Sequence, residues 1–198
     1  MQECWSFEAV GRPSFAQLSS FLDDHSEEES NAPRRNPVIS RQEMALAYSM
    51  KQSHLQNPEN WEIDPIDIKM NEEVLGKGHF GEVYKASLHG RIVAVKTIKP
   101  GAPMTEEQFI KEAETTRFLS HENIVRTIGV CSYKPYIVIE FLPGGSLKKY
   151  LNNLNVRNIT LSPTENLEIA RQIACAMTHL EKNNYIHRDL AARNILVG

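Results

Sequence analysis

The chain has 198 residues, of which 41% are hydrophobic and 24% charged, with a formal net charge of −3. This composition is ordinary for a globular protein with a sizeable core, and it gives no sign of a nucleic-acid-binding surface. No apolar run approaches the roughly 18 residues that a membrane-spanning helix requires. The three cysteines, Cys4, Cys131 and Cys175, are too widely spaced to predict a disulfide framework or a zinc site. We therefore expect a reducing, cytosolic or nuclear compartment.

Residues 1–24 contain the pattern C-W-x₆-R-P-x-F and continue as a predicted helix. Phe15, Leu18 and Leu22 recur on one helical face, and Pro13 suits the first turn. We expect these apolar side chains to need a core elsewhere in the chain.

Residues 25–60 are predicted to be a partly disordered linker. An acidic run at 27–29 and a segment at 31–37 rich in proline and arginine cannot bury enough apolar surface to order themselves. Residues 40–55 can form a helix that either docks on the following domain or stays solvated. Tyr48 in this helix is either a phosphorylation site or an ordinary tyrosine.

Three strands are predicted over 70–78, 81–88 and 91–98, after a tryptophan at position 61 that needs only to be a packing anchor. His89-Gly90 is the predicted hairpin turn between the last two.

The stretch between the first two strands reads G-x-G-x-x-G-x-V, and three glycines at this spacing let a backbone fold tightly over a polyanion. Lys96 ends the third, apolar strand, where its ammonium can reach the phosphates that the loop covers. A Rossmann turn has the same glycine spacing but needs a helix directly afterwards, whereas this sequence continues as a strand. A β-hairpin with a strand lysine is typical of protein kinases.

Thr105 and Gln108 predict a capping box that opens a helix. The apolar face of this helix comprises Phe109, Ile110, Ala113 and Phe118. Glu112 lies in the helix among other glutamates. From these sequence neighbours alone, we would expect it to be one more solvent-exposed charge. Two further strands are predicted at 127–131 and 136–140.

A short helix over 147–151, capped by Ser146, follows the break at Pro143-Gly144-Gly145. Ser162 and Glu165 then predict the capping box of a longer helix. Its apolar positions recur at a spacing of three to four residues and face a core: Leu167, Ala170, Ile173, Ala174, Met177 and Leu180.

The sequence from His187 to Asn194 reads H-R-D-L-x-x-x-N directly after this helix, which is a highly specific pattern. On these motifs, residues 61–198 resemble the first part of a protein tyrosine kinase domain of the cytoplasmic Fes/Fer, Src, Abl or Tec kind, and residues 1–24 resemble the end of one. The resemblance implies an α+β, two-lobed protein-kinase fold. Its N-terminal lobe would hold a five-stranded antiparallel sheet with one helix, and its helical C-terminal lobe would be incomplete.

The resemblance also implies a site for ATP and Mg²⁺, with Mn²⁺ as an alternative metal. Asp189 would orient and deprotonate the substrate hydroxyl, and Asn194 would bind the metal. Glu112 would form an ion pair with Lys96 and so aim the lysine at the phosphates, while Arg193 would be a catalytic cation. The implied nucleotide-binding residues, with the gatekeeper at 139 and the hinge at 140–142, are Leu75, Gly76, Lys77, Gly78, His79, Phe80, Gly81, Val83, Ala94, Lys96, Ile139, Glu140 and Leu142.

The sequence Ala191-Ala192-Arg193 resembles the pattern of tyrosine kinases. Serine/threonine kinases commonly carry a lysine where this chain has Ala191, and the shifted cation leaves room for an aromatic ring. We therefore expect ATP-dependent phosphorylation of tyrosines in protein substrates by a cytoplasmic signalling enzyme. Two alternatives stay open, a non-catalytic, nucleotide-binding pseudokinase-like fragment and a serine/threonine kinase.

The chain departs from the family pattern because it stops at Gly198, before any D-F-G. The aspartate that holds the principal metal, the activation loop and most of the larger lobe would then be missing. We expect this chain to be inactive by itself, as a fragment, a joined gene model or a part of a tandem kinase.

Overall fold

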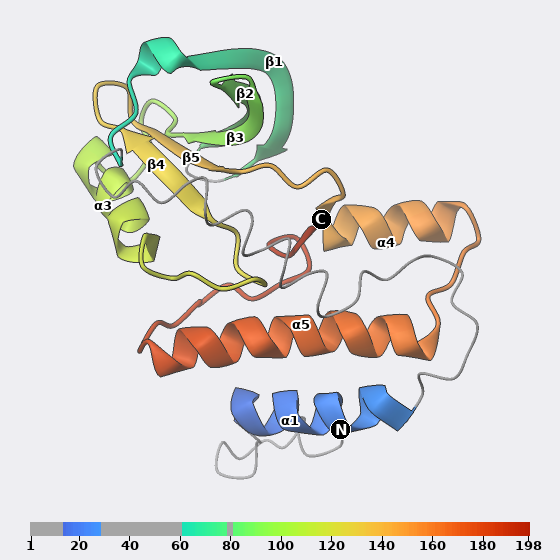
Figure 1. Cartoon of the computed structure of the whole chain (residues 1–198). Helices are drawn as coiled ribbons and strands as arrows, with labels where there is room; N and C mark the ends of the chain where they lie inside the picture. The colour runs from blue at the N-terminus through green and yellow to red at the C-terminus, as the bar shows by residue number, and fades with distance from the viewer. Residues whose placement is uncertain (1–13, 29–60, 79–80) are drawn as a thin grey trace.

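The computed structural model describes residues 14–28, 61–78 and 81–198. Residues 1–13, the segment 29–60 with its predicted helix and Tyr48, and the pair His79 and Phe80 lie outside the described residues. Figure 1 shows a twisted sheet with one helix beside it, above a layer of helices. The elements are α1 (Phe15–Glu28), η4 (Pro65–Asp67), β1 (Ile68–Lys77), β2 (Glu82–Leu88), β3 (Arg91–Thr97), α3 (Glu106–Thr116), β4 (Thr127–Cys131), β5 (Tyr136–Glu140), β6 (Gly145–Ser146), α4 (Leu147–Val156), α5 (Pro163–Lys182) and β7 (Leu196–Val197).

The five long strands form the predicted antiparallel sheet, and their order in it is β1-β2-β3-β5-β4. His89 and Gly90 turn β2 into β3 with φ angles of 48° and 80°, which suits a tight hairpin that follows the twist of the strands. The central strand β3 buries Val93, Ala94 and Val95 in succession, because β2 and β5 flank it. The strands on both sides of β3 therefore hold its last residues in a fixed position.

Helix α3 lies against β4 and β5. The predicted capping box is present, with Thr105 and Gln108 each bonding the other's backbone amide. Phe109 is fully buried and Ala113 nearly so, as the apolar pattern predicts. Phe118 does not join this face: the helix ends at Thr116 and the Phe118 side chain is 81% exposed. The prediction for Phe118 was wrong because the chain leaves helical geometry before reaching it.

The helical layer contains α4 and α5, whose serine caps are both present. Helix α4 runs to Val156, five residues beyond the predicted end. In α5 the buried side chains are Ala174, Ala176, Met177 and Leu180. Ala170 is exposed, contrary to its place in the predicted apolar face. Within the described part of the chain, no helix is long and apolar enough to cross a membrane.

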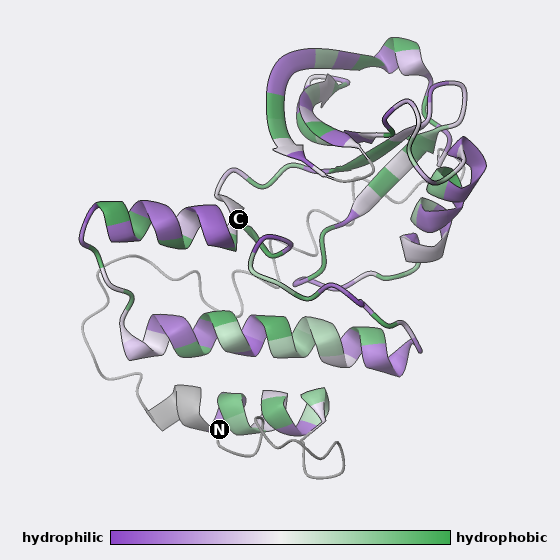
Figure 2. Ribbon diagram, turned by 180° about the vertical axis from the view of Figure 1, so that it is seen from behind, coloured by the Kyte–Doolittle hydropathy of each residue, from purple (hydrophilic) through white to green (hydrophobic). Residues whose placement is uncertain are grey.

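Helix α1 packs along α5 although 134 residues separate the end of α1 from the start of α5, and Figure 2 shows hydrophobic segments of both helices side by side. Leu22 is buried, and Leu18 is partly buried on the same face. The Asp23 carboxylate lies 3.5 Å from the Arg171 guanidinium. The pKa of that guanidinium is raised mainly by its hydrogen bonds to Glu168, against a smaller opposing effect of burial. The predicted N-terminal helix thus finds its core on α5 through Leu18 and Leu22, whereas Phe15, which was predicted on the same face, is exposed at the first residue of the helix.

Candidate functional site

The glycine-rich stretch forms the turn from β1 to β2 at one end of the sheet. The Gly78 amide donates to the Gly81 carbonyl over 2.8 Å, which closes the turn. Gly81 is buried so closely against β3 that an added Cβ would lie 1.7 Å from the Thr97 carbonyl oxygen. Gly76 has open space where a Cβ would be. The close approach at Gly81 therefore positions the loop over the end of β3.

Lys96 lies in β3 between Val83 of β2 and Ile137 of β5. Its Nζ is 3.2 Å from the Glu112 Oε1 of α3, so the predicted ion pair is present. The same ammonium lies 5.3 Å from the centroid of the buried Phe109 ring, which adds a cation–π contact. One turn of α3 thus supplies both the charge and the aromatic ring that hold Lys96.

Polar contacts around the loop were not predicted. The Lys99 ammonium donates to the Gly78 carbonyl over 3.2 Å and ties the loop to the segment after β3. At the start of β2, the Tyr84 hydroxyl donates to the Glu82 carboxylate over 2.5 Å, and Lys77 lies 3.4 Å from that carboxylate. The pKa of Glu82 is lowered, mainly by the Tyr84 hydroxyl, against a smaller opposing effect of burial. The Lys99–Gly78 and Lys77–Glu82 contacts each span a turn or more than one strand and have no local sequence signal. Tyr84 and Glu82 lie two residues apart in β2, so strand alternation places them on one face.

The segment after β5 carries the predicted gatekeeper and hinge. Ile139 pairs with Ala94 across the sheet, so these two side chains lie beside the loop-bearing strands. The Glu140 side chain accepts a hydrogen bond from the Arg126 amide over 2.8 Å, and the Glu140 amide donates to the Arg126 carbonyl over 3.0 Å. These two bonds fix the first hinge residue. Leu142 follows it, partly buried.

The remaining predicted nucleotide-binding side chains lie on the first two strands. Leu75 and Lys77 lie at the end of β1, and Val83 is the second residue of β2. Leu75 and Val83 are partly buried, and Lys77 is exposed. Their strands flank the same turn, so the structure brings them together with Gly76, Gly78 and Gly81.

The segment from His187 to Asn194 converges on Asp189. The Asn194 side-chain amide donates to both the backbone carbonyl and the carboxylate of Asp189, each over 2.8 Å. The Arg193 guanidinium forms an ion pair with the other carboxylate oxygen. The Asp189 amide donates to His187 Nδ1 over 3.3 Å. Arg188 has a φ of 65°, an unusual angle for a residue with a side chain.

A second strand pair holds this segment against the hinge. Strand β7 pairs with β6, just after the hinge, and the amides of Leu147 and Lys148 donate to the Ile195 and Ala192 carbonyls. Because these bonds join the start of α4 to the end of the segment, they fix Asp189 relative to the hinge.

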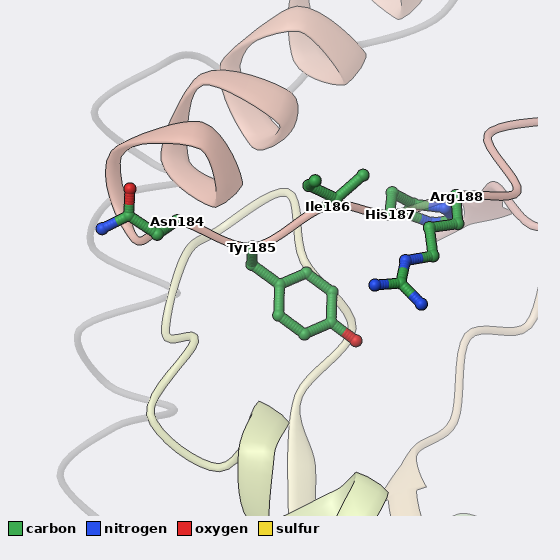
Figure 3. A pocket seen from close by; sticks show the side chains of 5 residues that line it. All are labelled: Asn184, Tyr185, Ile186, His187 and Arg188. Atoms are coloured by element: carbon green, nitrogen blue, oxygen red, sulfur yellow. The ribbon is translucent and has the colours of Figure 1, made fainter.

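A hollow of about 350 Å³ lies beside this segment, lined by residues 184–188. Figure 3 shows the Tyr185 hydroxyl and the Arg188 guanidinium pointing to the same side of the backbone, with Ile186 on the opposite side. The hollow thus presents a cation next to a phenol, beside the charged cluster around Asp189.

Metal binding can be judged from the donor atoms. Both amide hydrogens of Asn194 go to Asp189, so the Asn194 amide oxygen is the atom that can bind a hard cation. Among the described residues, no group of three or more His, Cys, Asp or Glu side chains could hold a metal ion. The residues present therefore fit part of the coordination of a magnesium ion, through the Asn194 amide oxygen.

Comparisons with known proteins agree with the fold and the site geometry described above. The family model described as protein tyrosine and serine/threonine kinase matches residues 68–198. The human tyrosine-protein kinase ABL2 is 44% identical over 144 residues, which are 71% of this chain and 12% of that protein. The human tyrosine-protein kinase FRK is 42% identical over 143 residues, 71% of this chain and 28% of that protein. The tyrosine-protein kinase SRK3 of Spongilla lacustris is 43% identical over 149 residues, 74% of this chain and 43% of that protein. The chain thus spans less than half the length of each.

Proposed function

The chain belongs to the protein tyrosine and serine/threonine kinase family, and from that premise we propose that it contributes an ATP-binding and catalytic segment for phosphorylation of protein tyrosines. The observation that carries the proposal is the Lys96–Glu112 ion pair at 3.2 Å, close to a glycine turn that is held against β3. A lysine paired with a helical glutamate keeps one conformer aimed at the nucleotide phosphates.

In the proposed complex, ATP lies between the glycine turn and the hinge. Backbone groups of 140–142 bind adenine, and Ile139 limits the depth of the pocket. Leu75, Val83 and Ala94 supply apolar contacts to the base, and their burial and placement on β1, β2 and β3 favour this role. His79 and Phe80 belong to the same proposed set.

Asp189 is the proposed base for the tyrosine hydroxyl. Its carboxylate is oriented by the Asn194 amide and the Arg193 guanidinium, and we propose that it accepts a hydrogen bond and then the proton of the attacking hydroxyl. The γ-phosphoryl group moves to the tyrosine oxygen as its bond to the β-phosphate oxygen breaks. Positioning and neutralisation of charge are the main sources of rate in this reaction.

The acceptor is proposed to be tyrosine because Arg193 reaches Asp189 from four residues further along the chain. Ala191 leaves the nearer position without a long side chain, so an aromatic ring has room there. The names of the relatives, which are tyrosine-protein kinases, support the same choice.

Magnesium is the proposed metal, with Mn²⁺ as an alternative. When bound, it would neutralise the negative charge of the phosphates that develops during transfer. Asn194 is the proposed ligand in this chain, through its amide oxygen. We also propose a cytoplasmic location, in keeping with the cysteine content, and tyrosine-containing proteins as substrates.

A second candidate function is nucleotide binding without phosphoryl transfer. It is favoured by one observation, that the described residues offer no carboxylate cluster for the metal. In that case Lys96 and the glycine turn would bind a nucleotide for regulation alone.

The test compares nucleotide binding with phosphoryl transfer in the same preparation. The chain, and the same chain extended past Gly198 by the rest of a tyrosine kinase domain, are each incubated with Mg²⁺, labelled ATP and a tyrosine peptide, with matched phenylalanine and serine peptides as controls. We expect both proteins to bind nucleotide and the extended protein to transfer phosphate to the tyrosine peptide only. In the extended protein, Asp189→Asn should lower the rate about 10²- to 10⁴-fold, the usual contribution of a general base, while nucleotide affinity stays within a few-fold. Binding without transfer in the extended protein would favour the second candidate, and transfer to the serine peptide would contradict tyrosine specificity.

A further inference from the structure

Tyr133 is the most exposed tyrosine in the described part of the chain. It lies in the turn 132–135 between β4 and β5, and its side chain is 85% exposed. An exposure this high for an aromatic ring leaves both its faces and its hydroxyl accessible to another protein.

The other described tyrosines are less accessible. The Tyr84 hydroxyl donates to Glu82, which together with burial raises the pKa of that phenol. Tyr136, Tyr150 and Tyr185 are each partly buried, and Tyr185 packs against the core around Leu180. Among these side chains, only Tyr133 could enter the active site of a kinase without first being pulled out of the fold.

The turn that carries Tyr133 is held by its neighbours. The Ser132 amide and hydroxyl both donate to the Glu62 carboxylate, over 2.6 and 3.0 Å. The Lys134 amide donates to the Cys131 sulfur over 3.4 Å. Because these contacts use the residues on either side, the backbone keeps the Tyr133 ring pointing away from the sheet.

Tyr133 cannot reach the catalytic segment of its own molecule. Figures 1 and 2 both show the β4–β5 turn at the outer end of the sheet, and the segment around Asp189 below the opposite end. The five-stranded sheet separates the two, so the catalytic aspartate must come from a different molecule.

We propose that Tyr133 is an acceptor for tyrosine phosphorylation in trans. The Tyr133 oxygen would form a bond to the γ-phosphorus of ATP as the bond to the β-phosphate oxygen breaks. ADP leaves, and the phenol proton passes to the catalytic aspartate of the other molecule and then to solvent. The proposal rests on the proposed function where that other molecule is a second copy of this chain.

The experiment uses the Asp189→Asn chain as the acceptor, because it should not phosphorylate itself, with Asp189→Asn/Tyr133→Phe as the matched control. In one arm the unmodified chain is the enzyme, and in the other arm a separate, active tyrosine kinase catalytic domain is the enzyme. Phosphate on each tyrosine peptide is measured by mass spectrometry over time under native conditions.

We expect the Tyr133 peptide to carry most of the phosphate in the second arm and the control to lose that signal. Phosphate on Tyr133 in the second arm alone would support the acceptor site and count against catalysis by this chain. If the second arm leaves Tyr133 unmodified, whether other tyrosines such as Tyr48 react or none does, the proposal is overturned.

Discussion

Gly81→Ala tests the close approach that positions the glycine turn. An alanine Cβ would lie 1.7 Å from the Thr97 carbonyl oxygen, and real contacts of this kind do not fall below 3.0 Å. The turn and β3 must therefore move apart, which strains the hydrogen bond from the Thr97 hydroxyl to the Glu82 carbonyl. We expect a loss of about 1–3 kcal/mol in the free energy of unfolding, as for other overpacked sites.

The assay is thermal unfolding followed by circular dichroism, in which each kcal/mol lowers the Tm of a chain this long by about 2–4 °C. Gly76→Ala is the matched control, because it adds the same methyl group in the same loop where nothing lies within 4 Å. Its Tm should stay at or slightly above that of the unmodified chain. Equal Tm values for the two variants would refute the packing argument.

Two further predictions concern the helical layer. Leu22→Ala should weaken the docking of α1 on α5 by about 2 kcal/mol or more, because Leu22 is buried there. The Cys175 thiol contacts Ser19 of α1, so weaker docking should speed its alkylation about thirtyfold. Ser20→Ala on the exposed face is the control, and an unchanged alkylation rate for Leu22→Ala would contradict the α1–α5 contact. Burial and the nearby charge of His179 lower the pKa of His121, against a smaller opposing effect of Glu122, and the two rings lie 5.0 Å apart. The unfolded chain therefore binds more protons than the folded one below the ordinary histidine pKa of about 6.5, so the free energy of unfolding from urea titrations should fall as pH drops through that value. His121→Asn should reduce this slope, and an unchanged slope would show that His121 is not responsible.

Elements set by neighbours in the chain were predictable from sequence. The capping boxes at Thr105 and Ser162 and the His89-Gly90 turn depend on residues three or fewer positions apart, and all three are present. Strands β4 and β5 have the predicted limits. The burial predicted for Phe15, Phe118 and Ala170 was wrong, because these side chains continue the apolar pattern of a helix but lie outside the part of it that packs against the core.

Contacts between distant segments were harder to predict. The Lys96–Glu112 ion pair was predicted only because the resemblance supplied it, since Glu112 has other glutamates as neighbours. Neither the Lys99–Gly78 bond nor the β6–β7 pair that fixes the catalytic segment has a local signal in the sequence. The roles of these residues in binding and catalysis stay predictions.

Mapping a bound nucleotide on the chain tests most directly whether ATP binds between the glycine turn and the hinge. The isotopically labelled chain would be titrated with Mg²⁺ and a non-hydrolysable ATP analogue, and amide shifts followed by NMR. We expect saturable amide shifts at Gly76, Gly78, Lys96 and Leu142, and weaker binding of the ATP analogue to the Lys96→Met variant. Absence of saturable shifts, or shifts confined to residues far from the glycine turn and hinge, would contradict it.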